Sequence, residues 1–135
     1  HADCLGSKNH DYWYARRRQW NDARTTRISV LMHVAIMGQR EGFFVDHING
    51  NTLDTRRSKL RWASRSQNAA NGKMRKNNTS GYRGVTRARG NFWQAGIGVK
   101  NHKMRLGYFR SAEAAAVAYD TAARTHHGAF ARTNF

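Results

Sequence analysis

Three side chains in the first half of the chain have the chemical types needed for hydrolysis at a metal ion. Asp46 can offer a hard oxygen to a divalent cation, and the adjacent His47 can take a proton from water near neutral pH. Asn68, further along, can bring a second oxygen. A site that gathers these groups around one ion could hydrolyse a phosphodiester. The ion would stabilise charge on the phosphate and on the departing 3′ oxygen, while the histidine activates water.

Local patterns predict the elements that would position these groups. An apolar run over residues 43–48 predicts a strand that runs into the Asp-His pair, and Asn49-Gly50-Asn51 predicts a tight turn. Residues 58–64 predict a second short strand. Residues 64–71 predict a helix with a serine as its N-cap. Two strands and a helix that returns to face them would bring the three groups together.

The segments upstream of this pattern are also short. Residues 12–20 mix aromatic side chains with arginines and predict a strand. Residues 24–37 alternate as a strand does at first, but from Leu31 onward a short helix is equally consistent with the sequence. His33 in this segment has two interpretations, a phosphate contact or extra metal ligand on one side and a partly buried structural histidine on the other. The second interpretation is favoured.

The charge of the chain narrows the class of partner. The 135 residues include 24 Lys and Arg but only 8 Asp and Glu, which gives a net charge of +16. Such an excess is typical of proteins that bind a polyanion, most often nucleic acid. The single cysteine, Cys4, excludes an internal disulfide and a cysteine-based zinc site. No apolar run is long enough to span a membrane, and we expect no membrane or protein partner.

The second half has a different pattern. Three β-like runs within residues 81–109 predict an antiparallel meander, with turns at Gly90-Asn91 and Asn101-His102. Residues 111–128 predict a helix that begins at an N-cap serine and ends at a glycine. The expected helix face and its core partners on the sheet are Ala112, Ala115, Ala116, Tyr119, Ala123, Trp93, Ile97, Leu106 and Phe109.

Four fragments of the first half resemble a known family. LMH at 31–33, VDHINGN at 45–51, RR-x-x-LRW at 56–62 and SQN at 66–68 are similar to the HNH homing endonucleases, which are ββα-metal nucleases. The resemblance implies cleavage or nicking of double-stranded DNA with one Mg²⁺ or another divalent cation such as Mn²⁺. It implies that Asp46 and Asn68 are metal ligands and that His47 is the general base. It also implies a cytoplasmic, nucleoid-associated protein of a bacterial or phage-infected cell.

The sequence departs from this family at one important place. Members usually carry asparagines where Thr55 and Lys59 stand here, and the asparagine before the leucine holds the histidine's loop in shape. Lysine cannot accept a hydrogen bond. Either Asn49 or Asn51 substitutes, or the loop is looser and catalysis is impaired. The alternative function is therefore a DNA-binding protein or transcription regulator derived from such a nuclease.

The second half resembles the plant Apetala-two DNA-binding domain over residues 79–135. SGYRGV, FWQAGIGV, LGYF, SAEAAAVAYDTAA and HGAFARTNF carry the likeness, in that order. The resemblance implies a three-stranded sheet that lies in the DNA major groove with the helix behind it. Arg83, Lys103 and Arg105 occupy family contact positions. Shorter residues than those of plant members stand at Thr86, Ala88, Gly96 and Gly98.

These arguments predict an α+β protein in two parts. We expect an HNH nuclease domain with the ββα unit over residues 1–71, a basic linker over 72–80 and an Apetala-two DNA-binding domain over 81–135. Because the chain begins with His, we expect the nuclease domain to lack its N-terminal part. The expected DNA-binding cations are Arg56, Arg57, Arg61, Lys73, Arg75, Lys76, Arg83, Arg87, Arg89, Lys103 and Arg105.

Overall fold

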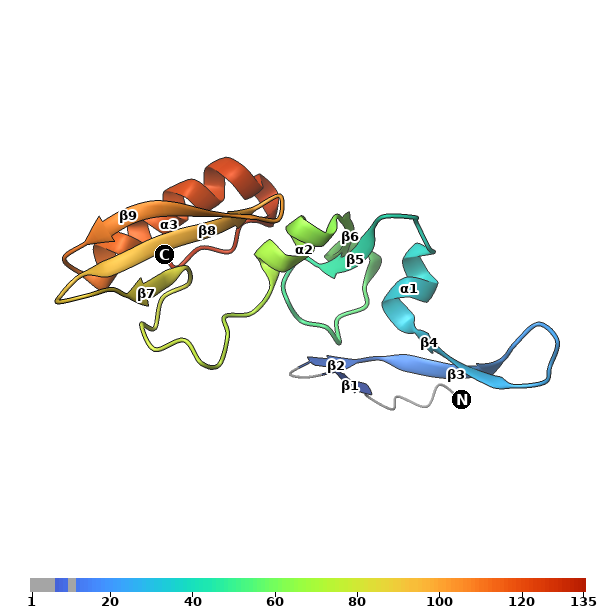
Figure 1. The fold of residues 1–135 in the computed structure, drawn as a ribbon. Coiled ribbons are helices and arrows are strands. Elements are labelled where there is room, and N and C mark those ends of the chain that lie inside the picture. The colour runs from blue at the N-terminus through green and yellow to red at the C-terminus, as the bar shows by residue number, and fades with distance from the viewer. Residues whose placement is uncertain (1–6, 10–11) are drawn as a thin grey trace. The chain divides into compact units, whose positions relative to one another are not determined.

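The computed structural model describes residues 7–9 and 12–135. The chain divides into two compact units, residues 1–64 and residues 65–135. Figure 1 shows the elements of both units along the chain. No helix within the described residues is both long and apolar enough to cross a bilayer.

The first unit begins with two antiparallel strand pairs. They are β1 (Ser7–Asn9) with β2 (Tyr12–Tyr14), and β3 (Arg16–Trp20) with β4 (Arg27–Leu31). The predicted strand over 12–20 is thus divided at Ala15, because the halves on either side pair with different partners. The Ala15 carbonyl accepts a hydrogen bond from the Met32 amide, 2.9 Å away, at the point where β4 gives way to a helix.

The rest of the first unit carries the segment of chemical interest. It comprises α1 (Met32–Met37), β5 (Phe44–His47), a 3₁₀ turn η1 (Arg57–Lys59) and β6 (Leu60–Ala63). Strands β5 and β6 are antiparallel, and α1 packs against both of them. The predicted strands at 43–48 and 58–64 are confirmed with shorter bounds. The ambiguity after Leu31 resolves as a strand through Leu31 and a helix from Met32.

The second unit is one helix followed by a sheet packed on another helix. Its elements are α2 (Arg65–Asn71), β7 (Val85–Arg87), β8 (Trp93–Val99), β9 (His102–Phe109), α3 (Ala112–His127) and the 3₁₀ turn η2 (Gly128–Phe130). The strands form an antiparallel sheet in the order β7-β8-β9, and α3 packs against one face of it. The expected α+β class, with ββα elements followed by a three-stranded sheet on a helix, is confirmed.

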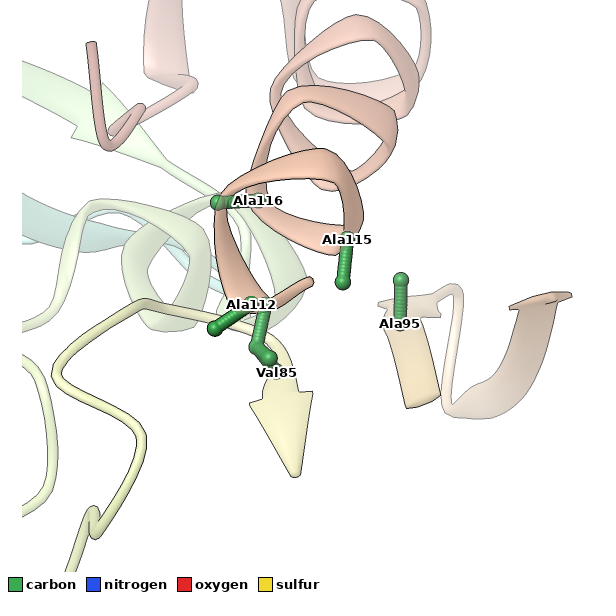
Figure 2. Packing of buried hydrophobic residues seen from close by; sticks show 5 residues of the cluster. All are labelled: Val85, Ala95, Ala112, Ala115 and Ala116. Atoms are coloured by element: carbon green, nitrogen blue, oxygen red, sulfur yellow. The ribbon is translucent and has the colours of Figure 1, made fainter. Parts of the chain in front are cut away.

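Small side chains let α3 lie close to the sheet. Ser111 caps the helix by accepting a hydrogen bond from the Ala114 amide, 3.1 Å away. Figure 2 shows Ala112 next to Val85 and Ala115 opposite Ala95, and Ala116 belongs to the same buried cluster. The whole expected face is buried: Ala112, Ala115, Ala116, Tyr119 and Ala123. Of the expected sheet partners Ile97 is buried, while Trp93, Leu106 and Phe109 pack at the margin of this core.

Two backbone features of the second unit need specific residues. Lys100 and Asn101 both have positive φ, 47° and 67°, as a type I′ hairpin turn requires, so the turn lies one residue earlier than predicted. Gly84 has a φ of +72°, and a Cβ there would stand 2.0 Å from Cδ2 of Tyr119. Only glycine fits this approach of β7 to α3.

Residues 72–80, predicted as a linker, contain no helix or strand and belong to the second compact unit. The Asn78 side chain organises this segment. Its Oδ1 accepts hydrogen bonds from the amides of Ser80 and Gly81, and its Nδ2 donates to the Tyr82 carbonyl, 2.8 Å away. The Arg83 guanidinium donates to the Gly72 carbonyl at 2.6 Å. The segment is thereby tied to the start of the sheet at both of its ends.

Candidate active site

Strand β5 brings Asp46 and His47 together at its C-terminal end, with only 5% and 4% of their surfaces exposed. Asp46 lies opposite Arg61 of β6 in the strand register. The Arg61 Nε donates to Asp46 Oδ2 over 2.8 Å, and both side chains are largely buried. A buried carboxylate is therefore balanced by a cation that the partner strand supplies.

Two other aromatic side chains pack around His47. The His33 ring meets the His47 ring edge to face, with centroids 5.0 Å apart. The Tyr14 ring lies 5.3 Å from His33 and 6.2 Å from His47. These rings come from β2, α1 and β5, three separate elements. Burial lowers the pKa of His47, against the opposing effect of the Asp46 and Asp54 carboxylates. The imidazole is therefore held in the neutral form that can accept a proton.

His33 is part of this cluster rather than of the surface. Its side chain is buried, and its Nδ1 has no hydrogen-bond partner within the described residues. Burial, and next the nearby His47, lower the pKa of His33 to about 4. The structure thus favours the structural interpretation of His33 over a surface phosphate contact. Burial also raises the pKa of Tyr14, with Tyr12 and Asp46 acting in the same direction.

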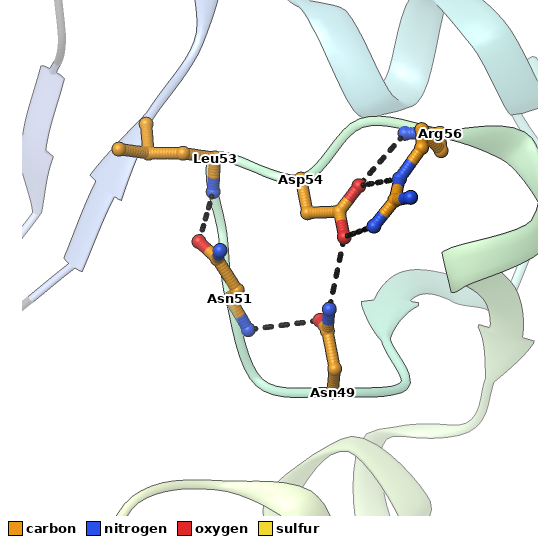
Figure 3. A network of polar contacts seen from close by, with 5 residues as sticks. All are labelled: Asn49, Asn51, Leu53, Asp54 and Arg56. Carbon is orange, nitrogen blue, oxygen red and sulfur yellow. Dashed lines mark hydrogen bonds and ion pairs between the residues drawn. The ribbon is translucent and has the colours of Figure 1, made fainter.

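The loop after His47 is held by its own side chains (Figure 3). The Asn49 Nδ2 donates to Asp54 Oδ2 at 3.0 Å, and Asn49 Oδ1 accepts from the Asn51 amide at 3.0 Å. The Asn51 side chain in turn accepts from the Leu53 amide. Hydrogen bonds from Arg56, and next from Asn49, hold the pKa of the Asp54 carboxyl well below its usual range. Two asparagines therefore shape the loop that follows the histidine.

Comparison with protein-family models adds a family to this geometry. Residues 38–70 match the model for HNH endonucleases. This segment is an HNH endonuclease domain. The match runs from the end of α1 through β5 and β6 into α2, and it contains Asp46, His47 and Asn68. The family implies a phosphodiester hydrolase whose substrate is DNA.

The three arginines expected to bind DNA near His47 differ in their exposure and in their hydrogen-bond partners. The Arg56 side chain is 71% exposed and forms two hydrogen bonds to the Asp54 carboxylate. The Arg57 side chain is exposed and donates to the Ile36 carbonyl at 3.2 Å. Arg61, in contrast, is committed to Asp46 and is only 17% exposed. Arg56 and Arg57 are thus the two of this set that reach solvent.

The expected metal ligands of the HNH domain lie on different elements. Asp46 lies on β5, while Asn68 lies on α2 with an exposed side chain. The described part of the chain contains no group of three or more His, Cys, Asp or Glu side chains that could hold a metal ion. Asp46 belongs to the first compact unit and Asn68 to the second. Carboxylate and amide oxygens are each of a type that binds Mg²⁺.

The other expected DNA-binding cations belong to the second unit. Arg87, Arg89, Lys103 and Arg105 are exposed on or beside the sheet. Four of the expected cations lie between residues 72 and 83: Lys73, Arg75, Lys76 and Arg83. Of these four, only Arg83 is partly buried. Lys73, Arg75, Arg83 and Lys103 line a hollow of about 700 Å³, and none of the described residues in its lining is acidic.

Local sequence patterns do not predict two further features of the structure. The contact of the Tyr14 ring with both histidines depends on how three elements pack, so local sequence patterns do not predict it. The alternation of side chains along a strand is a partial signal, because it places Tyr12 and Tyr14 on one face of β2 and Trp13 on the other. In the structure Tyr12 and Tyr14 are partly buried and Trp13 is exposed. The second feature is Gln94, which stands on the open face of the sheet.

Proposed function

We propose that this protein is a metal-dependent, site-selective DNA endonuclease of the homing type. Its C-terminal unit anchors duplex DNA, and the HNH domain hydrolyses a phosphodiester. The observation that carries the proposal is the buried pair of Asp46 and His47 at the end of β5, within the HNH match. A neutral histidine beside a carboxylate, close to a loop fixed by hydrogen bonds, has the chemistry that water activation needs.

Asp46 and Asn68 would hold one divalent cation of the Mg²⁺ class, or Mn²⁺ in its place. When bound, such a cation supplies charge stabilisation at the phosphate and at the leaving 3′ oxygen. The chain's residues do the rest. His47 accepts the proton of the attacking water, and the rings of Tyr14 and His33 restrict how the His47 ring can turn. Asn49 and Asn51 take over the loop-holding role of the asparagine that Lys59 replaces.

The second unit is the proposed DNA anchor of the Apetala-two type. Its sheet has one face covered by α3, and the residues of the other face include Lys103 and Arg105. Gly96 and Gly98 on that face have no side chains, so a DNA backbone or groove edge can come close to the middle strand. Anchoring through many phosphates leaves the HNH domain free to be chemically simple.

A DNA-binding protein without cleavage is the second candidate. Two observations favour it: Lys59 stands in place of the usual asparagine, and the Asp46 carboxylate is already paired with Arg61. If that ion pair outcompetes a cation, the HNH domain binds DNA and does not cut it.

Nicking of supercoiled plasmid separates the two candidates. The full chain is incubated with plasmid in Mg²⁺ or in EDTA, beside His47→Ala, and binding is measured in parallel. The endonuclease predicts relaxed plasmid only with Mg²⁺ and only for the wild type. Equal inertness of both proteins, with binding retained, would favour the second candidate.

A further inference from the structure

Gln94 lies on β8, the middle strand of the sheet, on the face that α3 does not cover. Its neighbours along β8 have the opposite orientation, since Trp93 packs against the core and Ala95 is fully buried in it. Because successive side chains of a strand alternate between faces, Gln94 points away from α3. Within the described residues, no hydrogen bond takes up its side-chain amide.

The strand register gives Gln94 two neighbours on the same face. Thr86 of β7 pairs with it on one side, and Tyr108 of β9 pairs with it on the other. Directly paired residues on one face are close enough for their side chains to touch. Tyr108 is 54% exposed, and the Arg105 guanidinium lies 5.7 Å from the centre of its ring. An amide and an aromatic ring are thus presented together, beside a cation.

These side chains also border a hollow in the surface. The hollow has a volume of about 730 Å³, and its lining is Arg87, Ala88, Arg89, Phe92, Gln94 and Tyr108. None of the described residues in this lining is acidic. Two arginines suit phosphates, two aromatic rings suit apolar groups, and one amide can both donate and accept hydrogen bonds.

We propose that Gln94 and Tyr108 read one A·T base pair in the major groove, with the Gln94 amide on adenine and the Tyr108 ring against the thymine methyl. The proposal rests on the anchoring of duplex DNA by the second unit and names what that anchor recognises. The Gln94 Nε2 donates to adenine N7, and its Oε1 accepts from the adenine N6 amino group. The thymine methyl of the same pair is the one apolar group in the major groove.

The composition of the open face makes Gln94 the residue for this readout. The cross-strand partners Gly96 with Arg105, and Gly98 with Lys103, place two cations next to two bare positions. Cations there suit phosphates, which fix the position of the duplex without reading its sequence. An amide can also contact a phosphate, but unlike a cation it can pair with both N6 and N7 of adenine. The face therefore divides into a positioning part and a reading part.

Selection from a randomised duplex library tests the readout with the full chain. Bound duplexes are sequenced for the wild type, Gln94→Ala and Gln94→Glu, with Gln39→Ala as a matched control at an exposed glutamine of the first unit. We expect the wild type and the control to select A·T at one position, by about 5- to 150-fold over other pairs. Gln94→Ala loses that preference. Gln94→Glu transfers it to C·G, because glutamate accepts from the cytosine amino group.

Thymine replaced by uracil at the selected position tests Tyr108. Removal of the methyl should weaken wild-type binding about fourfold and leave the Tyr108→Ala affinity unchanged. If the wild type binds duplexes but shows no base-pair preference that Gln94→Ala removes, the readout is overturned while the DNA anchor stands. Tighter binding to single strands than to duplexes would also overturn it. Absence of any DNA binding by the wild type would overturn the anchor as well.

Discussion

Arg61 lies directly opposite Asp46 across the β5–β6 pair, and its Nε donates to Asp46 Oδ2 over 2.8 Å. The proposed metal ligand thus already has a cationic partner within its own sheet. Arg61 balances the charge of the Asp46 carboxylate. A cation held by Asp46 would share that carboxylate with the guanidinium. The pair links the stability of the first unit to its proposed chemistry.

Replacement of Arg61 by alanine should destabilise the first unit by about 3 kcal/mol, because it leaves a buried carboxylate without its partner. Hydrogen exchange of residues 44–63 during urea unfolding measures this change. The double variant Asp46→Asn/Arg61→Ala is the control and should recover much of the loss, since no buried charge remains. Mg²⁺ should protect Arg61→Ala more than the wild type. Equal Mg²⁺ protection of both proteins would contradict competition between Arg61 and the metal.

The asparagine loop gives a second prediction. Asn49→Ala removes the donor to Asp54 and the acceptor for the Asn51 amide, so the first unit should lose about 1–2 kcal/mol and cleavage should slow while DNA affinity stays the same. Lys59→Asn restores the usual family residue. Because the loop is already held, this variant should change the cleavage rate less than twofold. A large gain in rate for Lys59→Asn would mean that the asparagines do not substitute.

Stability should depend on pH through His33. Its folded pKa of about 4 lies below the ordinary value of 6.5, so the unfolded chain binds more protons between these limits. The free energy of unfolding is therefore unaffected by the protonation of His33 above pH 6.5, and it decreases as the pH falls from 6.5 toward 4. Hydrogen exchange of β5 and β6 at pH 7.5 and pH 5 should therefore show weaker protection at the lower pH. His33→Phe, which keeps a ring in place, should reduce this difference in protection. If the difference is undiminished in His33→Phe, the pH dependence comes from titratable groups other than His33.

Salt dependence tests the DNA anchor. The logarithm of affinity should fall with the logarithm of salt concentration by about 0.9 for each phosphate neutralised. Lys103→Ala, at an exposed position, should make the slope shallower by about 0.9 without loss of stability. Arg83→Ala should make the slope shallower too. It should in addition lower the stability of the second unit by about 1–3 kcal/mol, because the Arg83 guanidinium donates a hydrogen bond to the Gly72 carbonyl. A slope that neither variant changes would argue against phosphate contacts at both residues.

Short-range patterns were enough to predict most elements and the helix face. The alanine spacing of residues 112–123 determined which side of α3 is buried, because helical periodicity depends on neighbours in sequence. The division of residues 12–20 at Ala15 was not predictable in this way. It depends on the partner each half finds in the fold, and a single apolar and basic run does not encode those partners.

The residue types of the candidate site were predictable from the sequence, but the contacts that surround them were not. Asp46 and His47 follow from an adjacent pair at a strand end, a local pattern. The Arg61 ion pair needs the strand register, and the ring cluster of Tyr14, His33 and His47 needs the packing of three elements. Those relations join residues far apart in sequence. Arg61 was accordingly assigned to DNA alone, although its side chain is committed to Asp46.

The role of His47 as general base is the central claim, and single-turnover cleavage tests it most directly. An end-labelled duplex that the wild type cuts is incubated with excess wild type or His47→Ala in Mg²⁺, and the affinity of each protein for the same duplex is measured in Ca²⁺. We predict that His47→Ala slows cleavage by about 10²- to 10⁴-fold while the affinity stays within about twofold. Cleavage by His47→Ala at the wild-type rate would contradict the account.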